Sequence, residues 1–288
     1  MRYRPPAVTP YAIMGVVNVT PDSFSDGGSF GDAAEAIAHA RRLIGEGAAI
    51  VDVGGESTRP GADPVPVQEE LRRVVGVVEG VAALGLGAQL SVDTMKLAVA
   101  EAAVEAGATY VNDVSAFRHE PALAGLVADR GLDCCLMHML GEPRTMQSDP
   151  RYGDVVSDVK AFLEERLAAA VAAGVPEERV QLDPGIGFGK TVAHNLELLR
   201  RLDEIVAIGR PVVLGTSRKS FLGRITGREA AGRVHGTVAT CVLGFERGAR
   251  IFRVHDVAAV ADGLAVAAAT LLRVPAEAPP SLSNRASR

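Results

Sequence analysis

The sequence contains little cysteine, with only three such residues in a chain of 288. This scarcity fits a reducing compartment, and we expect a cytoplasmic location. Cys134 and Cys135 are adjacent within an apolar stretch. We therefore expect buried thiols at these positions rather than a pair of metal ligands.

Long hydrophobic runs are also missing. The longest weakly polar run, GLAVAAATLL at 263–272, is too short for a transmembrane helix, which needs about 20 apolar residues. The opening MRYRPPAVTPYA has no continuous apolar core, so we expect no signal peptide. The chain has no basic excess either, since its formal net charge is −5. This charge argues against nucleic-acid and membrane partners, and an anionic ligand would need a local basic cluster.

The stretch DPGIGFGKT at 183–191 resembles the phosphate-binding loop of nucleotide-binding proteins. That motif requires four residues between its two glycines, and only three separate Gly185 from Gly189. Asp183 also lies where anionic phosphates would approach. The sequence therefore favours a different role for this turn.

Eight short β-rich stretches alternate with helical segments along nearly the whole chain. This order predicts an α/β fold in the form of a single (β/α)₈ TIM barrel with parallel strands, and a doubly wound sheet is the alternative. We expect a lead-in at 1–12, the barrel at 13–274 and a flexible tail at 275–288. The expected strands are at 12–19, 48–55, 88–93, 109–114, 133–139, 179–185, 211–217 and 249–256.

Polar side chains mark the ends of these strands, where barrel enzymes place their chemistry. Alternate residues share a face, so Ser91 and Asp93 should point inward together, as should Arg253 and His255. Each residue has a structural alternative: a strand-end Asp often caps a turn, Asp52 could anchor its own loop, and His138 is more simply a packed histidine. The convergence favours a site, because buried unpaired polar groups cost about 1–3 kcal/mol each. The set comprises Asn18, Asp52, Asp93, Asn112, His138, Asp183, Ser217, Lys219, Arg253 and His255.

Eight motifs, in order along the chain, resemble the dihydropteroate synthase family: VNVTPDSFSDGG, DVGGESTRPGA, SVDT, VNDVS, LMHM, LDPGIGFGKT, SRKSFLG and RVHDV. The resemblance extends from about Ile13 to Leu272. It implies that a dihydropterin carrying a CH₂-diphosphate is joined to 4-aminobenzoate, with release of diphosphate. It also implies a homodimer that binds only small-molecule substrates.

The resemblance assigns pterin binding to four residues. Asp183 would bind the guanidine-like edge of the ring, Asp93 and Asn112 would complete the pocket, and Lys219 would reach the polar side of the ring. The chemistry is consistent, because a carboxylate accepts two parallel N–H bonds from an aminopyrimidine edge as it does from arginine.

The resemblance also implies which residues bind the diphosphate, the metal ion and the acceptor substrate, 4-aminobenzoate. Arg253 and His255 would hold the diphosphate, with Thr58 and Arg59 nearby. Mg²⁺ would be bound by Asn18 and Asp26, since amide and carboxylate oxygens suit this ion. Ser220, at the start of a helix, would receive the benzoate carboxylate, and Phe188 and Pro60 would flank its ring. The candidate catalytic residues are Asp22, Arg59, Asp93, Lys219, Arg253 and His255.

We expect a dissociative mechanism, in which diphosphate departs before the weakly basic amine attacks. Two alternatives remain: a catalytically silent pterin-binding paralogue, and a methyltransferase that uses methyltetrahydrofolate.

Overall fold

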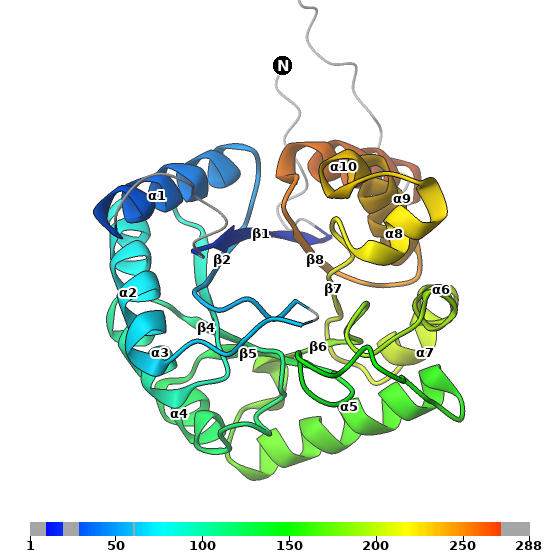
Figure 1. Cartoon of the computed structure of the whole chain (residues 1–288), viewed down its shortest axis with the longest axis horizontal. Coiled ribbons are helices and arrows are strands. Elements are labelled where there is room, and N and C mark those ends of the chain that lie inside the picture. Colours follow the sequence, from blue (N-terminus) through cyan, green and yellow to red (C-terminus); the bar gives the residue numbers. More distant parts are fainter. Residues whose placement is uncertain (1–9, 20–28, 60, 272–288) are drawn as a thin grey trace, which may run out of the picture.

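A computed structural model describes residues 10–19, 29–59 and 61–271. Its parallel strands form a ring inside a layer of helices (Figure 1). The expected barrel is confirmed, and the doubly wound alternative is wrong. The strands are β1 (Ala12–Asn18), β2 (Ile50–Gly54), β3 (Gln89–Asp93), β4 (Tyr110–Asp113), β5 (Asp133–Met137), β6 (Val180–Asp183), β7 (Val213–Leu214) and β8 (Ile251–Val254).

The strands pair in the order β6-β5-β4-β3-β2-β1-β8-β7. A parallel bridge between Leu182 and Val212 joins the two ends of this sheet. The Leu182 N–H also donates to the carbonyl oxygen of Pro211 at 3.0 Å. These contacts close the sheet into a barrel.

The helices surround the barrel and follow the strands in chain order (Figure 1). None of the described helices is long and apolar enough to cross a bilayer. The α-helices are α1 (Ser29–Gly45), α2 (Val67–Ala83), α3 (Leu97–Glu105), α4 (Ala122–Arg130), α5 (Val155–Ala172), α6 (Val192–Arg200), α7 (Leu202–Val206), α8 (Ser220–Thr226), α9 (Val234–Glu246) and α10 (Val257–Leu271).

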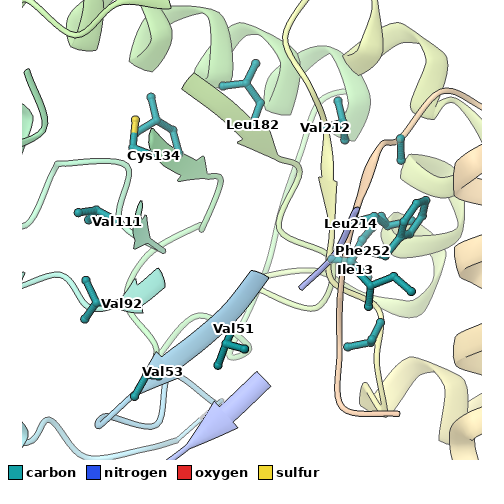
Figure 2. Packing of buried hydrophobic residues seen from close by; sticks show 14 of the residues in the cluster. Ile13, Val51, Val53, Val92, Val111, Cys134, Leu182, Val212, Leu214 and Phe252 are labelled. Carbon is teal, nitrogen blue, oxygen red and sulfur yellow. The ribbon is translucent and has the colours of Figure 1, made fainter. Parts of the chain in front are cut away.

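Each strand presents apolar side chains to the helix layer. Figure 2 shows members of this core, among them Val51 and Val53 of β2, Leu182 of β6 and Phe252 of β8. Because side chains alternate along a strand, the residues next to these apolar positions, such as Asp52 between Val51 and Val53, point into the barrel.

The inward-facing side chains divide into an apolar and a polar layer. Met14, Ile50, Tyr110, Cys135 and Val213 form a separate buried cluster inside the barrel. The polar side chains stand further along the same strands. The strand register places Asp52 beside Ser91, and Asp93 beside Asn112. The polar groups therefore gather at the carboxyl-terminal mouth of the barrel.

Candidate active site

Arg253 links two carboxylates at the barrel mouth. Its Nε donates to Asp52 at 2.6 Å, and its Nη2 donates to Asp93 at 2.7 Å. Asp52 is fully buried in the middle of β2 and also accepts from Ser91 Oγ at 2.6 Å and Asn112 Nδ2 at 2.9 Å. These contacts of Asp52 are with β3, β4 and β8, so they favour orientation of Arg253 and Asn112 over anchoring of the loop after β2.

Burial dominates the electrostatics of Asp93. It raises the pKa of this carboxyl to about 7, because the nearby charge of Arg253 offsets only part of the desolvation and the charge of Asp52 adds to it. The pKa of Arg253 is raised, because Asp52 and Asp93 outweigh the desolvation of the guanidinium. A fully charged arginine therefore stands at the mouth next to a carboxyl that titrates near neutrality.

Asp183 ends β6 and is 5% exposed. Its Oδ1 accepts the backbone N–H of Gly185 at 2.6 Å. Its Oδ2 and the Nζ of Lys219 each lie 3.7 Å from the point where a Cβ on Gly215 would stand, and Arg253 Cβ lies 3.9 Å from that point. Residues from β6, β8 and the loop after β7 thus surround one small volume, with one oxygen of Asp183 facing it.

Lys219 carries a cation into the same volume. Its Nζ donates to the carbonyl oxygen of Ile186 and lies 4.6 Å from the ring centroid of Phe188. Burial lowers its pKa to about 8, although Asp183 opposes the shift. The side-chain amine of Lys219 is therefore still mostly protonated at pH 7. It lies next to the Phe188 ring, on which a ligand could stack.

His255 follows β8 and is partly buried. Its backbone N–H donates to Ser217 Oγ at 3.1 Å, and its Nδ1 lies 3.0 Å from the same oxygen. Burial, the neighbouring charge of Arg253 and weaker effects of Arg218 and Arg59 lower its pKa to about 3. The imidazole is therefore neutral at pH 7.

The other expected site residues lie around this centre. Asn18 ends β1 and is partly exposed, and Thr58 is partly exposed in the loop after β2. Arg59 is exposed, and its charge makes a small contribution to the lowered pKa of His255. Ser220 is exposed as the first residue of α8. Three expected residues lie outside the described part of the chain: Asp22, Asp26 and Pro60.

The glycine-rich turn after β6 needs glycine for steric reasons. Gly185, Gly187 and Gly189 all have positive φ. A Cβ at Gly185 would overlap the carbonyl oxygen of His138, and one at Gly189 would stand 2.9 Å from the carbonyl oxygen of Leu140. The glycines therefore let the turn pack closely against the loop after β5 and hold Phe188 beside Lys219.

The lysine of this turn is buried against His138, which lies in the loop after β5. Lys190 Nζ contacts His138 Nδ1 at 2.8 Å and donates to the Phe188 carbonyl oxygen at 3.0 Å. Lys190 is 3% exposed, and burial lowers its pKa far below the ordinary value. His138 is buried in this contact, so its arrangement fits the packing role rather than a catalytic one.

We expect no ATP binding at the turn, because Lys190 cannot reach a phosphate without leaving its buried partners. Isothermal titration of the protein with ATP and Mg²⁺ should give no heat of binding up to millimolar nucleotide. A micromolar affinity that disappears in Lys190→Met would contradict this prediction.

Two buried groups at the site were not identified from the sequence. Asp113 orders the loop after β4 by accepting from the backbone N–H groups of Ser115 at 2.6 Å and Phe117 at 2.7 Å. Its position before Ser115 is a signal for this kind of Asx turn. Lys96 forms a buried ion pair with Glu70, and nothing in their spacing reveals the contact.

Known proteins resemble this chain over nearly its whole length. The family model described as pterin binding enzyme matches residues 14–255. A dihydropteroate synthase of Neisseria meningitidis serogroup C is 48% identical over 256 residues, 88% of this chain and 90% of the relative. A solved structure of Xanthomonas albilineans dihydropteroate synthase with 4-aminobenzoic acid aligns with a TM-score of 0.86 and 50% identity, covering 92% of this chain and 94% of that one. Another structure of that enzyme, in complex with 7,8-dihydropteroate, aligns with a TM-score of 0.82 and 46% identity, covering 92% and 95%.

Proposed function

We infer that this chain, which belongs to the dihydropteroate synthase family of pterin-binding enzymes, condenses (7,8-dihydropterin-6-yl)methyl diphosphate with 4-aminobenzoate. The products are 7,8-dihydropteroate and diphosphate, in folate biosynthesis. The observation that carries this inference is the convergence of Asp183, Lys219 and Arg253 beside Gly215. An acceptor for N–H groups, a donor and an anion-binding guanidinium are what such a substrate requires.

Asp183 suits the aminopyrimidine edge of the pterin. Its Oδ1 is partly engaged by Gly185, while its Oδ2 faces the volume shared with Lys219. Each carboxylate oxygen has a second lone pair, so the group can accept two parallel N–H bonds from the ring. Lys219 would donate to the opposite, polar side of the ring, and Asp93 and Asn112 would bound the pocket.

Arg253 and His255 would stabilise the departing diphosphate. Arg253 uses its Nε and Nη2 on Asp52 and Asp93, which leaves further guanidinium N–H groups for the anion.

His255 would donate a hydrogen bond to the diphosphate as a neutral imidazole. Ser217 Oγ accepts the backbone N–H of His255, so its own proton can go to Nδ1, and the imidazole proton then stands on Nε2. Thr58 and Arg59 would contact the same anion from the loop after β2.

Asn18 fits a magnesium site, because its amide oxygen is a ligand type that this ion accepts. The described residues contain no group of three acidic, histidine or cysteine side chains that could hold a metal by themselves. A site with few protein ligands, such as the amide oxygen of Asn18, suits Mg²⁺, because this ion usually keeps waters and substrate phosphates as its other ligands. When bound, the ion would neutralise charge on the diphosphate; Asp26 would be its second protein ligand.

The reaction we propose is dissociative. The bond between the methylene carbon and the diphosphate oxygen breaks, and its electron pair leaves with the diphosphate. The cation that remains is delocalised into the pterin ring and faces Asp93. The lone pair of the aminobenzoate nitrogen then forms the C–N bond, and a nitrogen proton is lost to solvent. Phe188 would flank the benzoate ring, and Ser220 with the first N–H groups of α8 would receive its carboxylate.

A diphosphate-release assay tests this function. The protein is incubated with the pterin diphosphate, 4-aminobenzoate and Mg²⁺, and we expect diphosphate to form in step with dihydropteroate. A silent paralogue would bind the pterin without release, and a methyltransferase would instead consume methyltetrahydrofolate.

We also propose a homodimer in the cytoplasm. Helices α9 and α10 border a hollow of about 610 Å³ that includes Val242, Val266 and Leu271. Val266 is 69% exposed and Leu271 47% exposed, a concentration of apolar surface that a second copy could cover. The three free, buried cysteines are compatible with a reducing compartment.

A further inference from the structure

One buried ammonium group ties together the base of the loop between β2 and α2, here named loop 2 (residues 55–66). Lys96 Nζ donates to the carboxylate of Glu56 at the start of this loop and to the carbonyl oxygen of Val65 at its end, the latter at 2.7 Å. Its remaining proton goes to Glu70 in α2. All three donors of the ammonium are therefore used.

The same cluster reaches the strand that carries Asp93. Glu70 is fully buried and also accepts from Thr94 Oγ1 at 2.7 Å. Thr94 directly follows Asp93. Burial alone would lower the pKa of Lys96, but the hydrogen bonds to Glu56 and Glu70 outweigh it and raise the pKa above its ordinary value. A permanently charged group thus connects loop 2, α2 and the end of β3.

Loop 2 has few other polar ties to the rest of the described structure. A hollow of about 460 Å³ lies beside it and is lined in part by Glu56 and Ser57. At the end of the loop, the Pro66 carbonyl oxygen accepts from the first N–H groups of α2, those of Glu69 at 3.0 Å and Glu70 at 3.1 Å. The other ties among the described residues are the hydrogen bonds from Arg73 to the Gly55 carbonyl oxygen at 2.8 Å and from the Gly61 N–H to the Pro143 carbonyl oxygen at 3.1 Å, and the ion pair between Asp63 and Arg144 at 3.9 Å. This ion pair is exposed and long, so it contributes little.

We propose that Lys96 is a positioning residue, which holds both ends of loop 2 against β3 and thereby places Thr58 and Arg59 at the barrel mouth. This inference rests on the proposed function, in which those two residues contact the diphosphate. The pterin pocket is built on the strands themselves. Loss of the tie should therefore weaken use of the diphosphate-bearing substrate and leave binding of the pterin ring in place.

The sharpest test is Glu56→Ala, which cuts the loop from Lys96 and leaves the buried Lys96–Glu70 pair intact. Loss of this charge-assisted hydrogen bond should raise the KM for the pterin diphosphate about tenfold, because Thr58 and Arg59 would no longer be held where they contact the diphosphate. The affinity for a pterin that lacks the diphosphate should stay within about twofold, because loop 2 makes no contact that this probe needs. Hydrogen exchange measured by mass spectrometry should become faster in the peptide covering 56–65 and stay unchanged in peptides of β6 and β8.

Two further variants serve as matched controls. Asp63→Ala removes one carboxylate from the same loop, where the side chain is 83% exposed, and should leave both measurements at wild-type values. Glu56→Gln keeps an oxygen that accepts from Lys96, so it should recover most of the KM and of the exchange protection.

The outcomes separate this inference from the proposed function. If wild-type protein releases no diphosphate, the function is wrong, and the exchange comparison still decides whether Glu56 and Lys96 hold the loop. Unchanged exchange in Glu56→Ala overturns the positioning role. The positioning role is also overturned if Glu56→Ala has lower thermal stability and fewer active molecules but wild-type KM values. A residue with a purely structural role would give that result.

Discussion

Replacing Asp183 with asparagine should abolish effective pterin recognition. Gly185 donates its N–H to Oδ1 of Asp183, so the carbonyl oxygen of an asparagine would turn toward Gly185. The NH₂ group of the asparagine would then face the ligand. This group is a hydrogen-bond donor, and it would meet the N–H groups of the pterin, which are donors too. A lost charge-assisted bond and a buried donor left unpaired together predict an affinity about 100-fold lower.

Titration calorimetry with a pterin that lacks the diphosphate measures this loss directly. Asp154→Asn is a suitable control, because Asp154 also accepts a backbone N–H, from Ser157, as the N-cap of α5. Asparagine caps helices well, so that variant should bind the pterin normally. An affinity within about twofold of wild type for Asp183→Asn would show that Asp183 does not bind the pterin.

The barrel could be predicted because its signals are local. Several strands alternate apolar and polar residues over a few positions, as Val51, Asp52 and Val53 show, and the helix layer takes the apolar set (Figure 2). The inward direction of Asp93 and Arg253 followed from the same alternation. Their meeting at one mouth followed from the rule that parallel strands end on one side of a barrel.

The pairing inside the site could not be predicted in this way. Asp52 and Arg253 are 201 positions apart, and Lys96 and Glu70 are 26 apart on different elements. Such contacts depend on the closure and register of the whole sheet. No local pattern distinguishes a carboxylate that orients an arginine from one that caps a turn, and for this reason Asp52 was open to a loop-anchoring interpretation.

The contact between Arg253 and these two carboxylates predicts a second large effect. In Arg253→Met the diphosphate loses the charged donor that β8 carries at the barrel mouth. Removing a single donor that stabilises developing negative charge typically lowers kcat by a factor of about 100–1000, and a full charge belongs at the upper end of this range. The substitution also leaves Asp52 and Asp93 buried without their cation, which should cost about 3–5 kcal/mol of folding free energy. A slow enzyme could therefore be slow only because it is partly unfolded.

The double variant Asp52→Asn/Arg253→Met separates the two effects. It removes one negative charge together with the positive one, and the amide can donate to Ser91 Oγ and accept from Asn112, so most of the thermal stability should return. The rate of diphosphate release should stay about 1000-fold below wild type, because the departing diphosphate still lacks the guanidinium of Arg253. Asp52→Asn alone keeps the pair between Arg253 and Asp93 and should lose far less activity than the double variant. Recovery of activity together with stability in the double variant would mean that Arg253 only balances buried charge, and that the leaving group is stabilised elsewhere at the mouth.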